Sequence, residues 1–134
     1  EKADFVLRRA VEIDPSDGAS LVNLAILALE SRKNESAEMY SRRALQQQPT
    51  SIPAKHVLGW AQMELGKLAD AKASFEEALR LDNANSALHH SMGILYRRQG
   101  HRAEAEREFQ TAKRLNPDVV KDFAERSFWS LWVE

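Results

Sequence analysis

The stretch LGWAQMELGKLADAKASFEEA, residues 58–78, is the strongest indication of the fold, because a similar stretch, MGILYRRQGHRAEAEREFQTA, follows at 92–112. Both copies place glycine, alanine and phenylalanine at the same positions. Two sets of evenly spaced alanines extend this period over the whole chain: Ala3, Ala37, Ala71 and Ala105, and Ala10, Ala44, Ala78 and Ala112. A fixed period of about 34 residues indicates a chain built from repeated units.

Within one period the pattern is helical. Between residues 71 and 81, the apolar Ala71, Phe75, Ala78 and Leu79 follow the spacing of one helix face. Asp17 is expected to accept the first free N–H groups of a helix. Gly66 and Gly100 stand where paired helices need a left-handed residue between them. No stretch alternates with period two, so the sequence predicts an all-α fold without strands.

Composition limits the class of protein. The chain has 134 residues with 19 Lys and Arg, 20 Asp and Glu, and a formal net charge of −1, so no overall charge attracts nucleic acid or anionic membrane. It contains no cysteine, which excludes disulfides, thiolate zinc sites and cysteine nucleophiles. The longest apolar stretch, Leu24 to Leu29, is far too short to span a bilayer.

The period divides the chain into one continuous domain of helix–turn–helix units. We expect the second helix of a truncated repeat over 1–17, full units over 18–51, 52–85 and 86–119, and a capping or next-repeat helix over 120–134. The chain begins with Glu1 and starts and ends within a unit, so the sequence indicates a fragment of a longer array, or a natural array without its capping parts.

This pattern resembles the tetratricopeptide repeat family. The resemblance rests on the following residues of the second and third units: Leu58, Gly59, Gly66, Ala71, Phe75, Ala78, Gly93, Tyr96, Gly100, Ala105, Phe109, Ala112 and Pro117. Small side chains at such places let paired helices approach closely, and the phenylalanine fills the adjacent gap. The first unit departs from the pattern with Ala25, Ala28 and Ser41, where Tyr40 or Met39 is expected to compensate.

The resemblance implies a right-handed superhelical solenoid whose first helices line a concave groove that binds peptides or protein segments. The residues predicted to line this groove and contact a partner are Asn23, Ile26, His56, Trp60, Met63, His90, Ile94, Arg97 and Arg98. The preferred function is therefore a non-enzymatic adaptor for an apolar peptide, with Arg97 and Arg98 selecting an acidic flank. Trp60 and Met63 can instead pack against neighbouring helices, and Asn23 can instead make a local contact.

Other activities fit the sequence less well. The family's carboxylate clamp for acidic chaperone tails needs lysine, asparagine and arginine where this chain has Ala19, Val57, Ala87 and Ser91. His56 and His90 can approach each other, but the sequence offers no third ligand, so we predict no metal and no cofactor. Arg42 and Arg43 lie on an outer helix where ion pairs such as Glu38–Arg42 are expected instead of nucleic-acid binding. No catalytic motif is present, so no enzyme is predicted.

The C-terminal residues Phe128, Trp129 and Trp132 belong to an unusually apolar run. They predict either a further repeat or self-association, so the alternative function is a structural spacer or assembly module that forms a homo-oligomer. A cap that folds back on the third unit is the remaining interpretation. We expect a soluble protein without membrane insertion, and both the cytoplasm and the periplasm fit the sequence.

Overall fold

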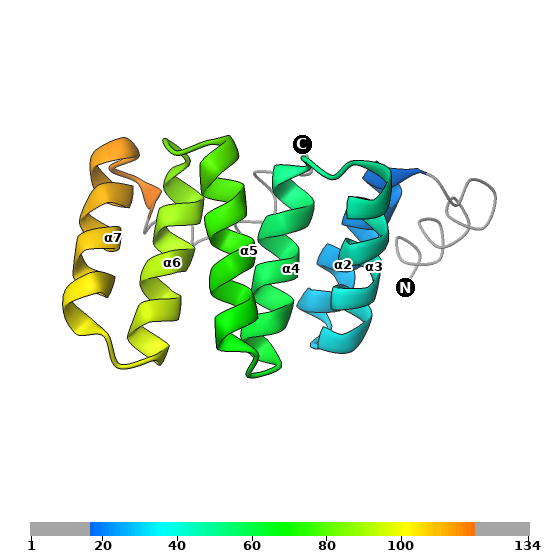
Figure 1. The fold of residues 1–134 in the computed structure, drawn as a ribbon, viewed down its shortest axis with the longest axis horizontal. Helices are drawn as coiled ribbons and strands as arrows, with labels where there is room; N and C mark the ends of the chain where they lie inside the picture. The colour runs from blue at the N-terminus through cyan, green and yellow to red at the C-terminus, as the bar shows by residue number, and fades with distance from the viewer. Residues whose placement is uncertain (1–16, 120–134) are drawn as a thin grey trace.

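The structure is a computed structural model that describes residues 17–119. These residues form a row of antiparallel α-helices that lie side by side, with α2 and α3 at one end and α7 at the other (Figure 1). The helices are α2 (Gly18–Glu30), α3 (Asn34–Gln47), α4 (Ile52–Glu64), α5 (Leu68–Leu81), α6 (Ser86–Arg98) and α7 (Arg102–Leu115). Residues 17–119 contain no strand, as predicted. The helices expected before residue 17 and over 120–134 lie outside the described residues.

Three helix pairs, α2 with α3, α4 with α5 and α6 with α7, form the repeated hairpins. Their first helices begin at Gly18, Ile52 and Ser86, which are evenly spaced, so the period of the sequence is the period of the structure. Each hairpin also packs on the next, because α3 contacts α4 and α5 contacts α6. The fold is therefore a solenoid of stacked α-hairpins, as expected.

Side-chain caps set the start of each first helix. The Asp17 carboxylate accepts from the Ser20 backbone N–H, as predicted, and the hydrogen bond from the Ser20 hydroxyl is the main reason that the pKa of Asp17 is lowered. Ser51 and Asn85 cap α4 and α6 in the same way, through the N–H groups of Ala54 and Leu88. Each cap satisfies a helix N–H that has no partner within the helix.

The turn inside each hairpin requires one residue with positive φ. Gly66 has φ of 81° and Gly100 has φ of 82°, which confirms their predicted left-handed conformation. In the first unit this place is taken by Arg32, with φ of 61°. A side chain is strained in this region, so the first hairpin contains a local conflict that the other two avoid.

The core consists of apolar residues buried between the helices. Phe75 and Leu88 are fully buried where α5 meets α6, and Leu21 and Ala54 are buried where α2 meets α4. In the first unit, Tyr40 packs against two of the core clusters, whereas Met39 is 48% exposed. Of the two residues expected to compensate for the small Ser41, only Tyr40 therefore packs on the core. The Ser41 hydroxyl itself donates to the Ala37 carbonyl over 2.7 Å.

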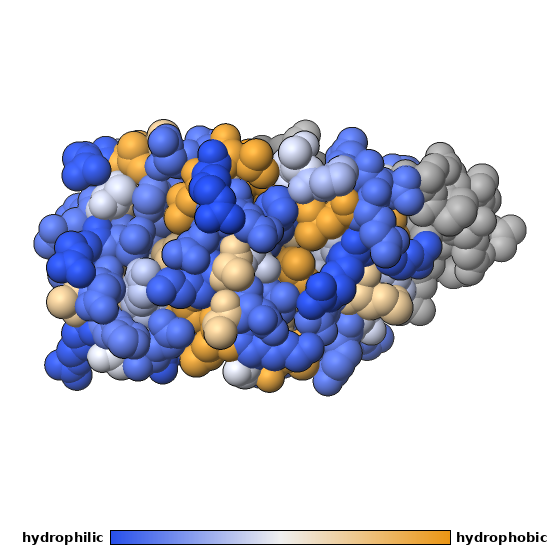
Figure 2. All heavy atoms as spheres, viewed as in Figure 1, coloured by the Kyte–Doolittle hydropathy of each residue, from blue (hydrophilic) through white to orange (hydrophobic). Residues whose placement is uncertain are grey.

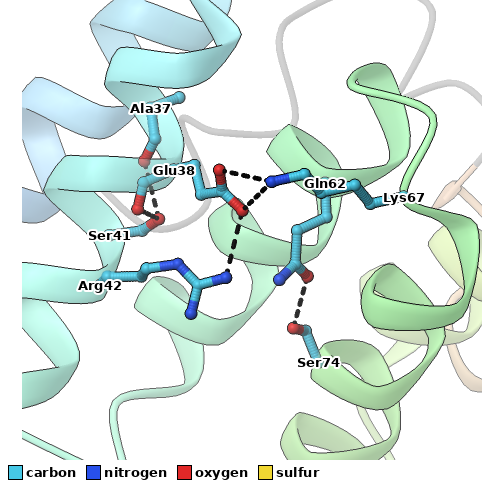
Figure 3. Close-up of polar contacts among 7 residues, drawn as sticks. All are labelled: Ala37, Glu38, Ser41, Arg42, Gln62, Lys67 and Ser74. Carbon is cyan, nitrogen blue, oxygen red and sulfur yellow. Dashed lines mark hydrogen bonds and ion pairs between the residues drawn. The ribbon is translucent and has the colours of Figure 1, made fainter.

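Polar contacts fasten the first unit to the second (Figure 3). Glu38 on α3 pairs with Arg42 over 3.1 Å, as predicted, and also with Lys67 before α5 over 3.1 Å. Partial burial alone would raise the pKa of Glu38, but the hydrogen bonds and charges of Lys67 and Arg42 lower it. Within the second unit, the buried Ser74 hydroxyl donates to the buried side-chain oxygen Oε1 of Gln62 over 2.7 Å.

Candidate functional site

The first helices carry one stripe of corresponding residues each. On α4 the stripe is Pro53, His56, Trp60 and Met63, at the spacing of a single helix face. The matching residues are Ala19, Val22, Ile26 and Leu29 on α2, and Ala87, His90, Ile94 and Arg97 on α6. Because α2 contacts α4 and α4 contacts α6, the three stripes lie next to one another. We call the side of the stack that carries these residues, together with the adjoining Asn23 and Arg98, the first-helix face.

Some predicted contact residues lie in the interior. Ile26 is 4% exposed, Met63 is 2% exposed and His56 is fully buried. Met63 belongs to the apolar cluster around Phe75, and the His56 ring meets the Phe75 ring edge-on with centroids 5.8 Å apart. The expectation that these three side chains line an open groove is therefore corrected: in this conformation they are core residues.

The other predicted residues reach the surface. Asn23, Trp60, His90 and Ile94 are half-buried, and Arg97 and Arg98 are exposed. Trp60 packs its ring against two core clusters yet keeps part of its surface accessible. The first-helix face is thus narrower than the sequence predicts, with aromatic and apolar surface in its middle and cations at one end.

A buried hydroxyl fixes the Trp60 indole. The indole N–H donates to Ser91 Oγ over 2.9 Å, and Ser91 Oγ lies 2.7 Å from His56 Nε2. Burial lowers the pKa of His56 to about 3, so its ring is neutral near pH 7 and Nε2 can accept the Ser91 proton. Ser91 is thus a positioning residue that the sequence did not predict, since it joins α6 to α4 through side chains more than thirty positions apart.

A hollow of about 370 Å³ opens at the α2 end of the first-helix face. Its lining residues are Gly18, Ala19, Val22, Asn23, Gln48, Ser51 and Pro53. Within residues 17–119, the side-chain amide of Asn23 has no hydrogen-bond partner. The hollow therefore combines apolar residues with the side-chain amides of Asn23 and Gln48 and the Ser51 hydroxyl, which can all donate and accept hydrogen bonds.

The cations lie at the other end of the face, where α6 finishes. Arg98 pairs with Glu64 over 2.8 Å and lies over the Trp60 ring at 5.8 Å from its centroid. Arg97 lies over the Phe109 ring at 5.4 Å, and no carboxylate of residues 17–119 is within ion-pairing distance of it. Burial lowers the pKa of His90, and the nearby Arg97 charge lowers it further.

The described residues offer no metal centre. His56 packs on Phe75 and His90 packs on Phe109, each the phenylalanine of its own hairpin. The ring centroids of His90 and Phe109 are 5.0 Å apart. No group of three or more His, Asp or Glu side chains in residues 17–119 is placed to hold a metal ion. The neighbouring His89 points elsewhere and binds Glu108 over 2.7 Å and the Asn83 carbonyl over 2.8 Å.

The face of the molecule in Figure 2 is mainly hydrophilic, with separate hydrophobic patches. Arg42 pairs with Glu38 instead of belonging to a free basic ridge. Arg8, Arg9 and the predicted self-association residues Phe128, Trp129 and Trp132 lie outside the described residues. No helix in the described part of the chain has the length and apolar character that crossing a bilayer requires.

Stacked α-hairpins of constant period, small residues facing phenylalanines, and glycine turns define the class of tetratricopeptide repeat solenoids. Residues 62–125 match the family model of the tetratricopeptide repeat, which confirms for this stretch the resemblance seen in the sequence. No curated protein matches the sequence.

Solved structures show the same fold. The thermophilic TPR protein TTC0263 of Thermus thermophilus is 23% identical with a TM-score of 0.81, and the match covers 97% of this chain and 73% of that one. MamA from Desulfovibrio magneticus RS-1 is 17% identical with a TM-score of 0.78, covering 87% of this chain and 66% of that one. MamA of MSR-1 is 23% identical with a TM-score of 0.72, and the match covers 85% of this chain and 66% of that one. This chain therefore spans about two thirds of the length of those MamA chains, and the likeness concerns the fold alone.

Proposed function

We propose that this chain is a non-enzymatic protein-interaction module that binds an extended, apolar segment of a partner protein along the first-helix face. The observation that carries the proposal is the hollow at Val22, Asn23 and Pro53, since Pro53 lies on the same stripe of α4 as the half-buried Trp60. Pro53 and Trp60 are two helical turns apart on one helix, or roughly 10 Å at about 1.5 Å per residue, which suits a segment of a few residues.

Asn23 supports an extended conformation of the bound segment. An extended peptide presents unpaired backbone N–H and C=O groups, and an asparagine amide can pair with one of each. The Asn23 amide lies in the hollow and is not used by any of residues 17–119. Two such hydrogen bonds would contribute about 1–3 kcal/mol, and they do not depend on the sequence of the segment.

Trp60 supports an apolar segment. Aromatic side chains held in place by their surroundings are frequent centres of binding energy, because a partner gains contact area without ordering them. The Ser91 hydroxyl and the two core clusters already hold the Trp60 indole. Proteins of the tetratricopeptide repeat family generally bind peptides on this face, and the sequence contains no motif for catalysis.

The test is selection of a phage-displayed library of random dodecapeptides on the full chain. We expect enriched peptides with two or more large apolar residues. Asn23→Ala should weaken their binding about ten-fold, whereas the matched control Asn83→Ala, which changes an exposed asparagine in the turn before α6, should not. Circular dichroism should show the same helicity for all three proteins.

Trp60 provides an independent arm of the same experiment. Trp60→Ala should leave helicity nearly intact and weaken peptide binding, and Trp60→Phe should lie between the two. If Trp60→Ala melts the protein at room temperature, Trp60 is a core residue and not a contact. If the selected peptides bind Asn23→Ala and Trp60→Phe as tightly as the parent chain, the first-helix face is not their site.

A further inference from the structure

The residue at the C-terminal end of each first helix changes from negative to positive along the array. Glu30, Glu64 and Arg98 occupy the same place in three successive first helices, one repeat apart. The preceding place holds Leu29, Met63 and Arg97. The third unit therefore presents two neighbouring guanidinium groups where the first two units present a carboxylate beside an apolar side chain.

Only part of this positive charge is neutralised within the described residues. Glu64 pairs with Arg98 over 2.8 Å, and no carboxylate of residues 17–119 pairs with Arg97. The effect of Arg97 is already visible on a neighbour, because its charge adds to burial in lowering the pKa of His90. The corner at Arg97 and Arg98 thus has an excess of positive charge next to the Trp60 ring.

Resting on the proposed function, we propose that Arg97 and Arg98 bind an acidic side chain of the partner segment, and that Glu64 competes with it for Arg98. The occupant is an apolar segment with an aspartate or glutamate next to the residue that contacts Trp60. Arg98 already lies over the Trp60 ring, so a carboxylate that reaches Arg98 brings the neighbouring apolar side chain to the indole.

The Glu64–Arg98 pair is suited to exchange. The Arg98 and Glu64 side chains are 41% and 36% exposed, and ion pairs in such surroundings contribute little because water screens them. An incoming carboxylate can form two parallel hydrogen bonds with one guanidinium, or bridge both. Glu64 consequently sets a threshold: a neutral segment does not displace it, whereas an acidic one replaces it at Arg98 and also neutralises Arg97.

The experiment uses the strongest peptide from the library selection and a second peptide in which each Asp or Glu is replaced by Asn or Gln. Both are titrated against the full chain and three variants. Glu64→Gln should strengthen binding of the acidic form about two- to five-fold, and Arg97→Gln should weaken it by a similar factor. Neither should change binding of the amide form. Arg114→Gln, a matched change of an exposed arginine at the end of α7, should affect neither peptide.

The outcomes separate this inference from the proposed function. Selected peptides that lack acidic residues, an amide form that binds as tightly as the acidic form, or a Glu64→Gln effect of equal size on both forms would each overturn it. In those cases a continued dependence on Asn23 leaves the peptide-binding function standing. Loss of the difference between the two forms at high salt, with the amide form unaffected, is the expected result.

Discussion

Gly59 lies directly against the ring of Phe75: a Cβ atom built on Gly59 would be 2.4 Å from Cε1 of that ring. Gly93 and Phe109 repeat the relationship in the next unit, with a distance of 2.5 Å. In the first unit the corresponding residues are Ala25 and Ser41, so a larger residue on the first helix faces a smaller one on the second. The chain thus shows two solutions to the same close approach of paired helices.

Gly59→Ala should destabilise the protein, because the Phe75 ring is fully buried and cannot move aside without disturbing α4 or α6. We expect a loss of about 1–3 kcal/mol in the free energy of unfolding, measured by urea titration. The double variant Gly59→Ala/Phe75→Ser copies the pair of the first unit. Its loss should differ from the sum of the two single losses by more than about 0.5 kcal/mol. Additive losses would show that the two residues do not constrain each other.

Arg32→Gly should stabilise the protein. Arg32 has φ of 61°, in the region where side chains are strained and glycine is not. The free energy of unfolding should rise by about 1 kcal/mol, since relief of strain outweighs the greater freedom of glycine in the unfolded chain. Arg32→Ala is the matched control, because alanine removes the charge and keeps the strain. An equal gain from alanine would assign the effect to the arginine side chain.

Ser74→Ala should cost about 1–3 kcal/mol, because it leaves the buried carbonyl oxygen of Gln62 without its donor. Thr111→Ala removes a hydrogen bond from a less buried hydroxyl to the Arg107 carbonyl and should cost less than about 0.5 kcal/mol. The double variant Ser74→Ala/Gln62→Leu should regain most of the stability lost by Ser74→Ala. Thermal unfolding followed by circular dichroism measures all three changes.

The stability of the fold should fall as the pH is lowered from about 6.5 towards 4.5. Burial lowers the pKa of His56 from 6.5 to about 3, so in this window the unfolded chain takes up a proton that the folded chain does not. The unfolded state is then favoured by up to about 1.4 kcal/mol per pH unit for each such group. His90, whose pKa is lowered in the same direction, adds to the slope.

His56→Gln should flatten this profile, whereas His101→Gln, which changes an exposed histidine, should leave it unchanged. Urea unfolding at half-unit steps of pH gives the slope directly. A parent chain whose stability does not change between pH 6.5 and 4.5 would contradict the buried, neutral state of His56.

Much of the hairpin geometry could be predicted from the sequence because it depends on residues close together in the chain. The Asp17 cap joins residues three apart, the Glu38–Arg42 pair joins residues four apart, and the positive φ of Gly66 and Gly100 is a property of single residues. The positive φ of Arg32 was not predicted, because the first hairpin keeps the turn geometry of the other two although its sequence has no glycine at that place.

The candidate site was predicted less well. Repetition placed the predicted contact residues on the first helices, and Trp60, Asn23, Ile94, Arg97 and Arg98 do reach the surface. However, repetition alone cannot tell how deep a residue lies. His56 and His90 occupy equivalent places, yet only His56 is fully buried.

The order of residues along the chain was enough to establish the period and the all-α class, since these follow from helix periodicity and small residues at fixed intervals. The packed stack was needed to show that Ser91 joins His56 to Trp60, that Lys67 reaches back to Glu38, and that Tyr40 and not Met39 packs against the core. These contacts depend on how closely neighbouring helices approach and on which rotamers the packed interior allows. Both are properties of the assembled stack, to which every helix contributes, and not of any one segment.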